Sequence, residues 1–241
     1  GSDGAEPSFT SPSTMVFGGG GYCTGVGPTP ALVKGMHKVG SEFTIEAWWY
    51  YAGGGSNVHP IFDSGTVDAG GSDTSRGVIF GDMGSLVPPA AGSFGFRVKR
   101  DSAAESALSV HLTTPLTTGW HHLAVSYQQG AGAFLWVDGA AASTNLGVTW
   151  DGTLTSPGTS DPVNPMRIGA RGDAAFKAAN GSKLDLLRIY DRALTTGELA
   201  QNWEYRRYSY SIAAAGGCGS SHRYWRWINI AVDGGYLEIS E

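Results

Sequence analysis

Hydrophobic and polar side chains alternate along residues 119–139, GWHHLAVSYQQGAGAFLWVDG, and this pattern marks the centre of the predicted fold. Leucine, valine and tyrosine at 123, 125 and 127 alternate with smaller or polar residues. A second alternation runs from 134 to 137, and both have the period of two of a pleated strand. Glycines between the two runs supply a short turn, so the segment predicts a β-hairpin, and Asp138-Gly139 begins a turn into a third strand.

Shorter segments of the same character predict an antiparallel fold of many strands. These segments, each bounded by Gly, Pro, Ser or Asp, are 15–17, 42–51, 59–63, 77–80, 94–99, 108–112, 140–146, 166–169 and 183–190. The polar stretches 64–76 and 149–162 show no periodicity and are predicted to be loops. The regular spacing of strands and turns is typical of a β-sandwich.

Local signals near the C-terminal end of this pattern predict one turn and one helix. Asn180-Gly181 favours a turn between the last two strands. Thr195 and Glu198 have the spacing of a capping box, which predicts a short helix. That helix is expected to carry Leu199, Asn202 and Trp203.

Composition agrees with an all-β class. The 241 residues contain 37 glycines and 15% charged residues, which suits short strands and turns better than helices. A chain of this length with 41% hydrophobic residues can bury one sizeable core, so one main domain is expected. The net charge of −5 gives no overall attraction to nucleic acid, and no apolar run is long enough to span a membrane.

The segment Glu42–Tyr51, EFTIEAWWYY, carries aromatic residues on both of its faces. A central strand does this when its second face is covered, or when that face forms a concave surface towards a ligand. Core filling is the favoured interpretation. Under the ligand-facing alternative, Glu46, Trp48 and Tyr50 are candidate carbohydrate contacts.

Four motifs in order resemble a known family. They are FTIEAWWYY, then GWHHLAVSYQQGAGAFLWVDG, then MRIGARG, then KLDLLRIYDRALTTGEL, and together they span roughly 15–205. The order and spacing resemble the laminin G-like branch of the concanavalin A-like lectin and glucanase superfamily. This resemblance implies an all-β jelly-roll sandwich of two curved antiparallel sheets. To this the capping box adds one short C-terminal helix, and the alternating residues over 228–239 add a terminal β-hairpin.

The resemblance also divides the chain. We expect a flexible N-terminal segment over 1–12, a laminin G-like sandwich over 13–207 and an extension over 208–241 with a β-hairpin. The hairpin either begins a second module or packs onto the sandwich. Basic and aromatic residues interleave in this extension, yet the acidic balance of the chain argues against nucleic acid as a partner.

The sequence favours binding over catalysis. Glucanases of this superfamily place catalytic carboxylates in an ExDxxE spacing on one strand, and that spacing does not occur here. No metalloprotease, nucleophile-elbow or P-loop motif occurs either. His121 and His122 are strand neighbours predicted to point to opposite faces, so they do not readily share a metal ion.

Three functional hypotheses follow from the fold class. The first is a non-catalytic, extracellular carbohydrate-binding or adhesion module of a secreted, surface or virion protein, with a glycan or cell-surface polysaccharide as partner. The second is a protein–protein adhesion or spacer domain, and the third is a divergent glycoside hydrolase or lyase. For the first, we favour a glycan site in the loop 149–162, where Trp150 adjoins Asp151 in a polar setting.

Calcium is a candidate cofactor because some relatives hold it at the rim of the sandwich. The resemblance matches one of their aspartates to Asp185, while a glycine run at 18–21 stands where another ligand would be expected. Asp63, Asp68 and Asp73 could contribute from neighbouring loops. Alternatively, Asp185 caps a turn.

The two cysteines, Cys23 and Cys218, lie near opposite ends of the chain and lack the spacing of a metal site. They either form a disulfide or act as two small unpaired hydrophobic residues. Because the extracellular hypothesis places the protein in an oxidising environment, we predict the disulfide.

Overall fold

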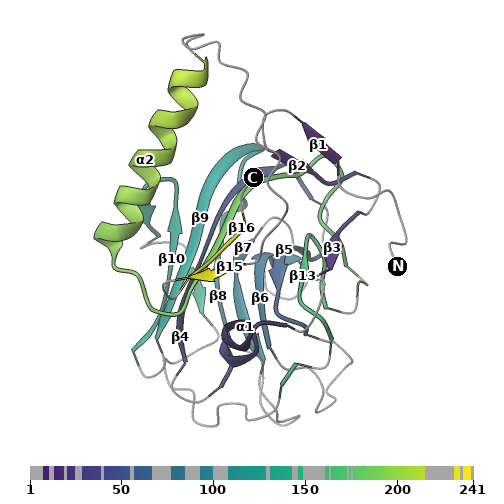
Figure 1. Ribbon diagram of the computed structural model, residues 1–241. Coiled ribbons are helices and arrows are strands. Elements are labelled where there is room, and N and C mark those ends of the chain that lie inside the picture. Colours follow the sequence, from purple (N-terminus) through teal and green to yellow (C-terminus); the bar gives the residue numbers. More distant parts are fainter. Residues whose placement is uncertain are drawn as a thin grey trace.

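The computed structural model confirms an all-β sandwich of two antiparallel sheets (Figure 1). It describes residues 8–10, 14–18, 21–24, 29–38, 41–54, 57–66, 77–84, 93–99, 108–128, 131–142, 146–148, 161–162, 164–172, 174, 176–214, 231–233 and 236–239. Every strand pair in this described part of the chain is antiparallel, as the alternating patterns predict.

The first sheet is built around the strand with aromatic residues on both faces. Its path is β1 (Ser8–Thr10), β2 (Thr14–Val16), β14 (Lys183–Tyr190), β4 (Glu42–Tyr51), β9 (Gly119–Gln128), β10 (Gly132–Val137) and β11 (Ala140–Ala141). The predicted hairpin is β9 and β10, paired from Leu123–Val137 to Gln128–Gly132. β1 lies within the segment 1–12 that we expected to be flexible.

The second sheet covers the opposite side of the core. Its path is β12 (Leu146–Val148), β8 (Leu108–Leu112), β7 (Phe94–Lys99), β6 (Gly77–Asp82), β5 (His59–Asp63), β13 (Arg167–Ile168) and β3 (Cys23–Thr24). The short helix α1 (Ala31–Gly35), which we did not predict, buries Val33.

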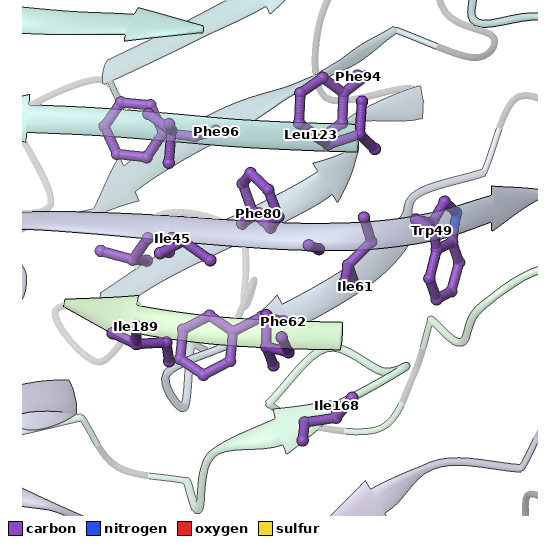
Figure 2. Close-up of a cluster of buried hydrophobic side chains, with 14 of the residues drawn as sticks. Ile45, Trp49, Ile61, Phe62, Phe80, Phe94, Phe96, Leu123, Ile168 and Ile189 are labelled. Atoms are coloured by element: carbon purple, nitrogen blue, oxygen red, sulfur yellow. The ribbon is translucent and has the colours of Figure 1, made fainter. Parts of the chain in front are cut away.

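The core lies between the sheets and takes alternate residues from both. Figure 2 shows Ile45 and Trp49 of β4 in one buried cluster with Ile61, Phe80 and Phe96 of the second sheet. Aromatic rings pack edge to face or tilted across this layer, as for Phe43 and Phe96, whose ring centroids lie 6.1 Å apart at 71°. Burying each such side chain stabilises the fold by roughly 1.5–3 kcal/mol, and the alternation along the strands is therefore what fixes which face of each sheet turns inward.

Two sequence predictions about connections were wrong. Asn180-Gly181 does form a turn, with Gly181 at a φ of 86°, but it does not join a hairpin, because β13 and β14 belong to different sheets. The strand predicted over 140–146 is instead divided between β11 and β12, which also lie in different sheets. Local turn signals cannot tell a hairpin from a crossover between two layers.

The C-terminal helix, α2 (Thr196–Ala214), is longer than the short helix predicted. After Gly197 its sequence contains no glycine or proline to stop it, and the apolar pattern that we used ends before the helix does. Beyond α2, β15 (Ala231–Asp233) pairs with β16 (Tyr236–Ile239), and β16 pairs with β14 over Leu187–Tyr190 (Figure 1). The terminal hairpin thus adds to the edge of the first sheet.

Candidate functional site

The outer face of the first sheet carries four polar or aromatic rows that point away from the core. Each row is a pair of neighbouring residues on β4 and β9. On β4 the rows begin at the residues between the core positions, namely Thr44, Glu46, Trp48 and Tyr50. Their cross-strand partners on β9 are, in the same order, Ser126, Ala124, His122 and Trp120. Because paired residues share a face, the four rows form one ladder from end to end of this face.

The segment 192–194 covers the first row through hydrogen bonds with Thr44 and Ser126, and helix α2 covers the second and third rows (Figure 1). The alternative in which the second face of β4 is covered therefore holds for these three rows. Leu199 is fully buried and belongs to a small apolar cluster with Ala124 and Trp136. Farther along the helix, the ring of Trp203 stacks on that of Trp48, with centroids 5.1 Å apart and planes 7° from parallel. The predicted capping box begins this helix.

The capping box is made by reciprocal hydrogen bonds. The backbone N–H and the hydroxyl of Thr195 donate to Glu198 Oε2 at 2.8 and 2.9 Å, and the Glu198 N–H donates to Thr195 Oγ1 at 3.3 Å. Arg192 lies 2.7 Å from the other carboxylate oxygen. The Arg192 hydrogen bond and the Thr195 donors lower the pKa of Glu198 to about 2, so the cap stays charged at neutral pH.

A polar network centred on Glu46 ties α2 to the sheet. Glu46 is fully buried, and its Oε1 atom lies 2.9 Å from His122 Nε2. Its Oε2 atom accepts from Asn202 Nδ2 at 2.9 Å and from the Tyr190 hydroxyl at 3.1 Å. Because a carboxylate only accepts, all three neighbours act as donors. Burial, with the Glu46 charge nearby, raises the pKa of Tyr190 to about 12, so this hydroxyl keeps its proton.

The network corrects part of the carbohydrate-site hypothesis. Glu46 and Trp48 are 0% and 5% exposed, beneath Asn202 and Trp203 of the helix. Neither side chain can reach a glycan in this arrangement. The physical reason is that α2 supplies the aromatic stack and hydrogen bonds that a sugar would otherwise provide, which strand periodicity alone does not reveal.

The fourth row, by contrast, lies open. Trp120 at the start of β9 is 38% exposed, and its ring lies edge-on to that of Tyr50, with centroids 5.7 Å apart at 72°. On the other side of Tyr50, Lys183 is its cross-strand partner on β14, and the Lys183 ammonium lies 5.1 Å from the centre of the Tyr50 ring. We call Trp120, Tyr50 and Lys183 the aromatic platform.

Sequence reasoning found Tyr50 but missed its partner. The alternation that places His122 and Ala124 on one face of β9 also puts Trp120 on that face, one step earlier. The signal that could have found Trp120 was therefore the same period of two, followed back to the residue after Gly119, where β9 begins. What it could not give is the pairing of β4 with β9, which brings the two rings together.

The edge of the sandwich behind the platform is held by a second polar contact. The Tyr51 hydroxyl donates to Asp82 Oδ2 at 3.3 Å, and the backbone N–H of Gly84 donates to Asp82 Oδ1 at 2.9 Å. Burial and the Asp82 charge raise the pKa of Tyr51 to about 12. This contact joins the end of β4 to the end of β6, so it fixes the strand that carries Tyr50.

The two adjacent histidines point to opposite faces, as predicted. His122 contacts Glu46, whereas His121 Nδ1 lies 2.7 Å from Asp138 Oδ2 and its Nε2 lies 2.8 Å from the Thr117 carbonyl. Burial alone would lower the pKa of His121, but these two acceptors and the charge of Asp138 raise it. An acceptor at each ring nitrogen favours the protonated form of His121, in which both nitrogens donate, and both nitrogens are engaged by these contacts.

The predicted calcium ligands are only partly within the described residues. Asp63 is fully buried, and its oxygens accept from the N–H groups of Gly65 and Thr66 and from the Thr66 hydroxyl at 2.5–2.7 Å. Asp185 is the extra residue of a bulge in β14 and is 8% exposed. Asp68 and Asp73 lie outside the described residues. Within the part of the chain that the structure describes, no group of three or more His, Cys, Asp or Glu could hold a metal ion, and the calcium site stays a prediction.

Three further predicted site residues fall outside the described part of the chain. These are Trp150 and Asp151, proposed for glycan binding, and Cys218, the predicted disulfide partner. Cys23 lies on β3, half-buried, with its Sγ 3.7 Å from Met15 Sδ. Both the loop site and the disulfide therefore remain predictions.

Comparison with known proteins settles the family. A laminin G-type family model, described as "Concanavalin A-like lectin/glucanases superfamily", matches residues 18–200. The chain thus belongs to this superfamily, in agreement with the resemblance drawn from the four motifs. No curated protein sequence matches the chain closely enough to count as a relative.

Solved structures share the fold at low sequence identity. The receptor binding domain of botulinum neurotoxin D is 8% identical with a TM-score of 0.53, and the match covers 86% of this chain and 46% of that one. The binding domain of Paraclostridial Mosquitocidal Protein 1 is 16% identical (TM-score 0.45; 69% and 37% covered). Trypanosoma rangeli sialidase is 14% identical (TM-score 0.47; 83% and 28% covered). The chain spans less than half the length of each, so these likenesses concern the fold alone.

One further observation bears on membranes. Among the described residues, no helix is both long and apolar enough to cross a bilayer.

Proposed function

We propose that this domain is a non-catalytic glycan-binding module of a larger secreted, surface or virion protein, and that the aromatic platform is its contact surface. The observation that carries the proposal is the exposed indole of Trp120 beside Tyr50, on a sheet face whose other rows are covered by α2 and the segment 192–194 that precedes it. Membership of a superfamily that includes lectins is consistent with this, although the fold alone does not assign a function.

The chemistry of the platform suits a sugar. Pyranose rings present flat C–H faces that pack on aromatic rings, and their hydroxyls need polar partners nearby. Trp120 and Tyr50 offer two rings at an angle, while Lys183 offers a cation and donor at the border. Both strands are held rigidly by the core, so little conformational entropy is lost on binding.

The burial and hydrogen bonding of Glu46 support a non-catalytic role. It is a strand carboxylate on the same face as the platform, but both its oxygens are already engaged and no solvent reaches it. A glycosidase needs two accessible carboxyl groups on either side of the scissile bond. Helix α2 removes this one from any such role.

The first test is a glycan array, screened with calcium and again with chelator. Binding that is lost with chelator supports the calcium prediction, and binding that survives separates the lectin role from the metal. Release of sugar products would instead favour the hydrolase or lyase hypothesis. No binding to any glycan class would contradict the proposal and favour a protein–protein adhesion or spacer domain.

The second test locates the site with matched variants. Trp120→Ala is expected to weaken binding of an array hit by at least about 1 kcal/mol, roughly fivefold, in titration calorimetry. Tyr205→Ala is the control, because Tyr205 is an aromatic residue on α2 that is 71% exposed and does not belong to the platform. Equal loss in both variants, or in neither, would exclude the platform.

The loop 149–162 is a second proposed contact region. Trp150→Ala is expected to weaken binding by a similar amount, at least about 1 kcal/mol, with a nearly unchanged melting temperature. If Trp150→Ala binds normally while Trp120→Ala does not, the site is the platform alone. A large loss of stability in Trp150→Ala would show that this indole is buried.

A further inference from the structure

The turn that precedes β14 places an exposed asparagine directly before a glycine. Asn180-Gly181 is the only Asn-Gly pair in the sequence. The Ser182 N–H donates to the Ala179 carbonyl at 3.0 Å, which closes a β-turn. Asn180 and Gly181 are the two central residues of this turn, and Gly181 has a φ of 86°, which glycine adopts without strain. The Asn180 side chain is exposed.

An Asn-Gly pair carries both reactants of a deamidation. The backbone nitrogen of the glycine attacks the side-chain amide carbon of the asparagine, a new C–N bond forms, and the amide nitrogen leaves as ammonia. Water then opens the cyclic succinimide at either of its carbonyls, which gives aspartate or isoaspartate. Glycine is the residue that hinders this attack least, because it has no side chain. The overall reaction takes up one water molecule and releases one ammonia, with no oxidation or reduction.

In the folded chain, the attacking nitrogen is held by a hydrogen bond. The Gly181 N–H donates to the Phe17 carbonyl at 2.8 Å, and the Phe17 N–H donates to the Ser182 carbonyl at 2.9 Å. These two bonds continue the antiparallel pairing of β2 with β14, and we call them the β2–β14 junction. The Gly181 nitrogen must leave its acceptor before it can lose its proton and turn towards the amide. The reaction therefore requires local opening of the junction.

The side chain of Phe17 makes this opening unfavourable. Phe17 is 1% exposed, and the centre of its ring lies 5.4 Å from that of Trp49 in the core. The ring also lies so close to Gly169 that no Cβ would fit there. Opening the junction disturbs these contacts and exposes apolar surface. Packing in the core thus controls a reaction at an exposed turn.

We propose that Asn180 is a deamidation site controlled by the fold. Its amide is lost slowly while Phe17 holds the Gly181 nitrogen, and quickly once the β2–β14 junction opens. Isoaspartate runs the main chain through the side-chain carbon, which adds one methylene group, about 1.5 Å, between residues 180 and 181. Both junction bonds are made by the residues directly after this insertion. The isoaspartyl product therefore holds β2 less firmly to β14, whatever ligand the domain binds.

The test compares the folded chain with the same chain unfolded in guanidinium chloride, both incubated at one mildly alkaline pH. Peptide mapping by mass spectrometry locates the conversion of amide to acid, and labelling with a protein isoaspartate methyltransferase measures isoaspartate. Conversion at Asn180 is expected to be at least about tenfold slower in the folded chain. The other asparagines, none of which precedes a glycine, are internal references.

A matched pair of core variants tests the junction itself. Phe17→Leu keeps an apolar side chain but removes the ring contact with Trp49, so the folded variant should deamidate at least about threefold faster than the parent chain. Phe80→Leu is the control, because Phe80 is an equally buried ring on β6 of the second sheet. It is expected to deamidate within about twofold of the parent chain. Thermal melting checks that both variants fold.

Two variants of Asn180 separate the added charge from the longer backbone. Asn180→Gln keeps an amide whose longer side chain does not form the succinimide, so no conversion is expected at this position. Asn180→Asp adds the same negative charge without the extra methylene group. The deamidated parent chain, purified by ion exchange and containing isoaspartate, is expected to melt at a lower temperature than freshly prepared Asn180→Asp.

The opposite outcomes overturn the proposal. No conversion at Asn180 in the unfolded chain would exclude the site, and equal rates in the folded and unfolded chains would exclude control by the fold. Equal acceleration in Phe17→Leu and Phe80→Leu would assign the reaction to global unfolding and not to the junction. Identical melting of the deamidated chain and Asn180→Asp would refute the weakened attachment of β2.

Discussion

The buried carboxylate of Glu46 offers the sharpest test of how α2 is attached. Replacing it in Glu46→Ala removes the common acceptor of His122, Asn202 and Tyr190. His122 is fully buried, so its Nε2–H has no access to water once the carboxylate is gone. The helix and the sheet would then face each other across unsatisfied donors and a cavity.

The magnitude follows from the three bonds. Leaving a buried donor without its acceptor typically costs about 1–3 kcal/mol, and more where the acceptor was charged, because the remaining group stays desolvated. Asn202 and Tyr190 are half-buried and bond to each other at 3.3 Å, so they recover part of the loss. We therefore expect Glu46→Ala to lower the free energy of unfolding by about 3–4 kcal/mol, a large fraction of a typical total of 5–15 kcal/mol.

Glu46→Gln serves as the conservative comparison. It keeps the volume and one acceptor oxygen, but its amide group must meet a donor on one side. We expect it to cost about half as much as Glu46→Ala. The difference in stability between the two variants therefore separates the cost of lost hydrogen bonds from the cost of lost volume.

Urea unfolding, followed by far-UV circular dichroism, measures both variants. A lower midpoint with an unchanged slope indicates lost stability without a change in the surface exposed. Near-UV dichroism reports the stacked pair of Trp48 and Trp203, whose signal should weaken in Glu46→Ala. If Glu46→Ala unfolds within about 1 kcal/mol of the parent chain, the network does not attach the helix and the reasoning fails.

Three further predictions use other parts of the structure. Gly139→Ala should lower the free energy of unfolding by more than about 1 kcal/mol in the same urea assay. Gly139 has a φ of 88°, and a Cβ there would lie 2.6 Å from Trp203 Nε1. An unchanged free energy of unfolding would mean that the Trp203 ring moves aside. Burial raises the pKa of Asp63 from 3.8 to about 6, so the folded state holds this proton more tightly than the unfolded state. The stabilising contribution of the protonated Asp63 is present below about pH 4 and is lost as the pH rises to about 6. The melting temperature of the parent chain should therefore fall over this range, and that of Asp63→Asn should not. Identical pH profiles of the two melting temperatures would refute the prediction. Cys23 and Cys218 should resist thiol labelling under denaturing, non-reducing conditions, and mass spectrometry showing two labelled thiols would end the disulfide prediction.

Much of the sandwich could be predicted because strand periodicity is a local property. The bounds 42–51, 59–63, 94–99, 108–112 and 183–190 agree with β4, β5, β7, β8 and β14 residue for residue. In β4 and β7 the apolar residues that alternate in sequence also face the core, whereas bulges shift the alternation in β5 and β14. Turn residues then helped to mark the strand ends, because glycine, proline, serine and aspartate favour turns.

The candidate site was harder to predict because it depends on which strands are neighbours. Tyr50 and Trp120 are far apart in sequence and meet only through the pairing of β4 with β9. The extension of α2 past Trp203, and its closure over Glu46, were likewise not visible in an apolar pattern that ended early. The pairing of β13 with β3 was not predictable either, because each strand has only two residues and carries too little pattern to place.

The sequence alone thus determined most of the longer strands, the faces on which their side chains alternate and the superfamily to which the chain belongs. These follow from periodicity and from motifs that any segment carries within itself. The tertiary structure decided which of the outward-facing residues remain open, because that depends on where α2 lies across the sheet. Glu46 and Tyr50 have the same strand, face and spacing, yet one is sealed under a helix and the other stands beside an exposed tryptophan. Whether a side chain is buried depends on which residues pack against it, and packing between segments distant in sequence decides which residues those are.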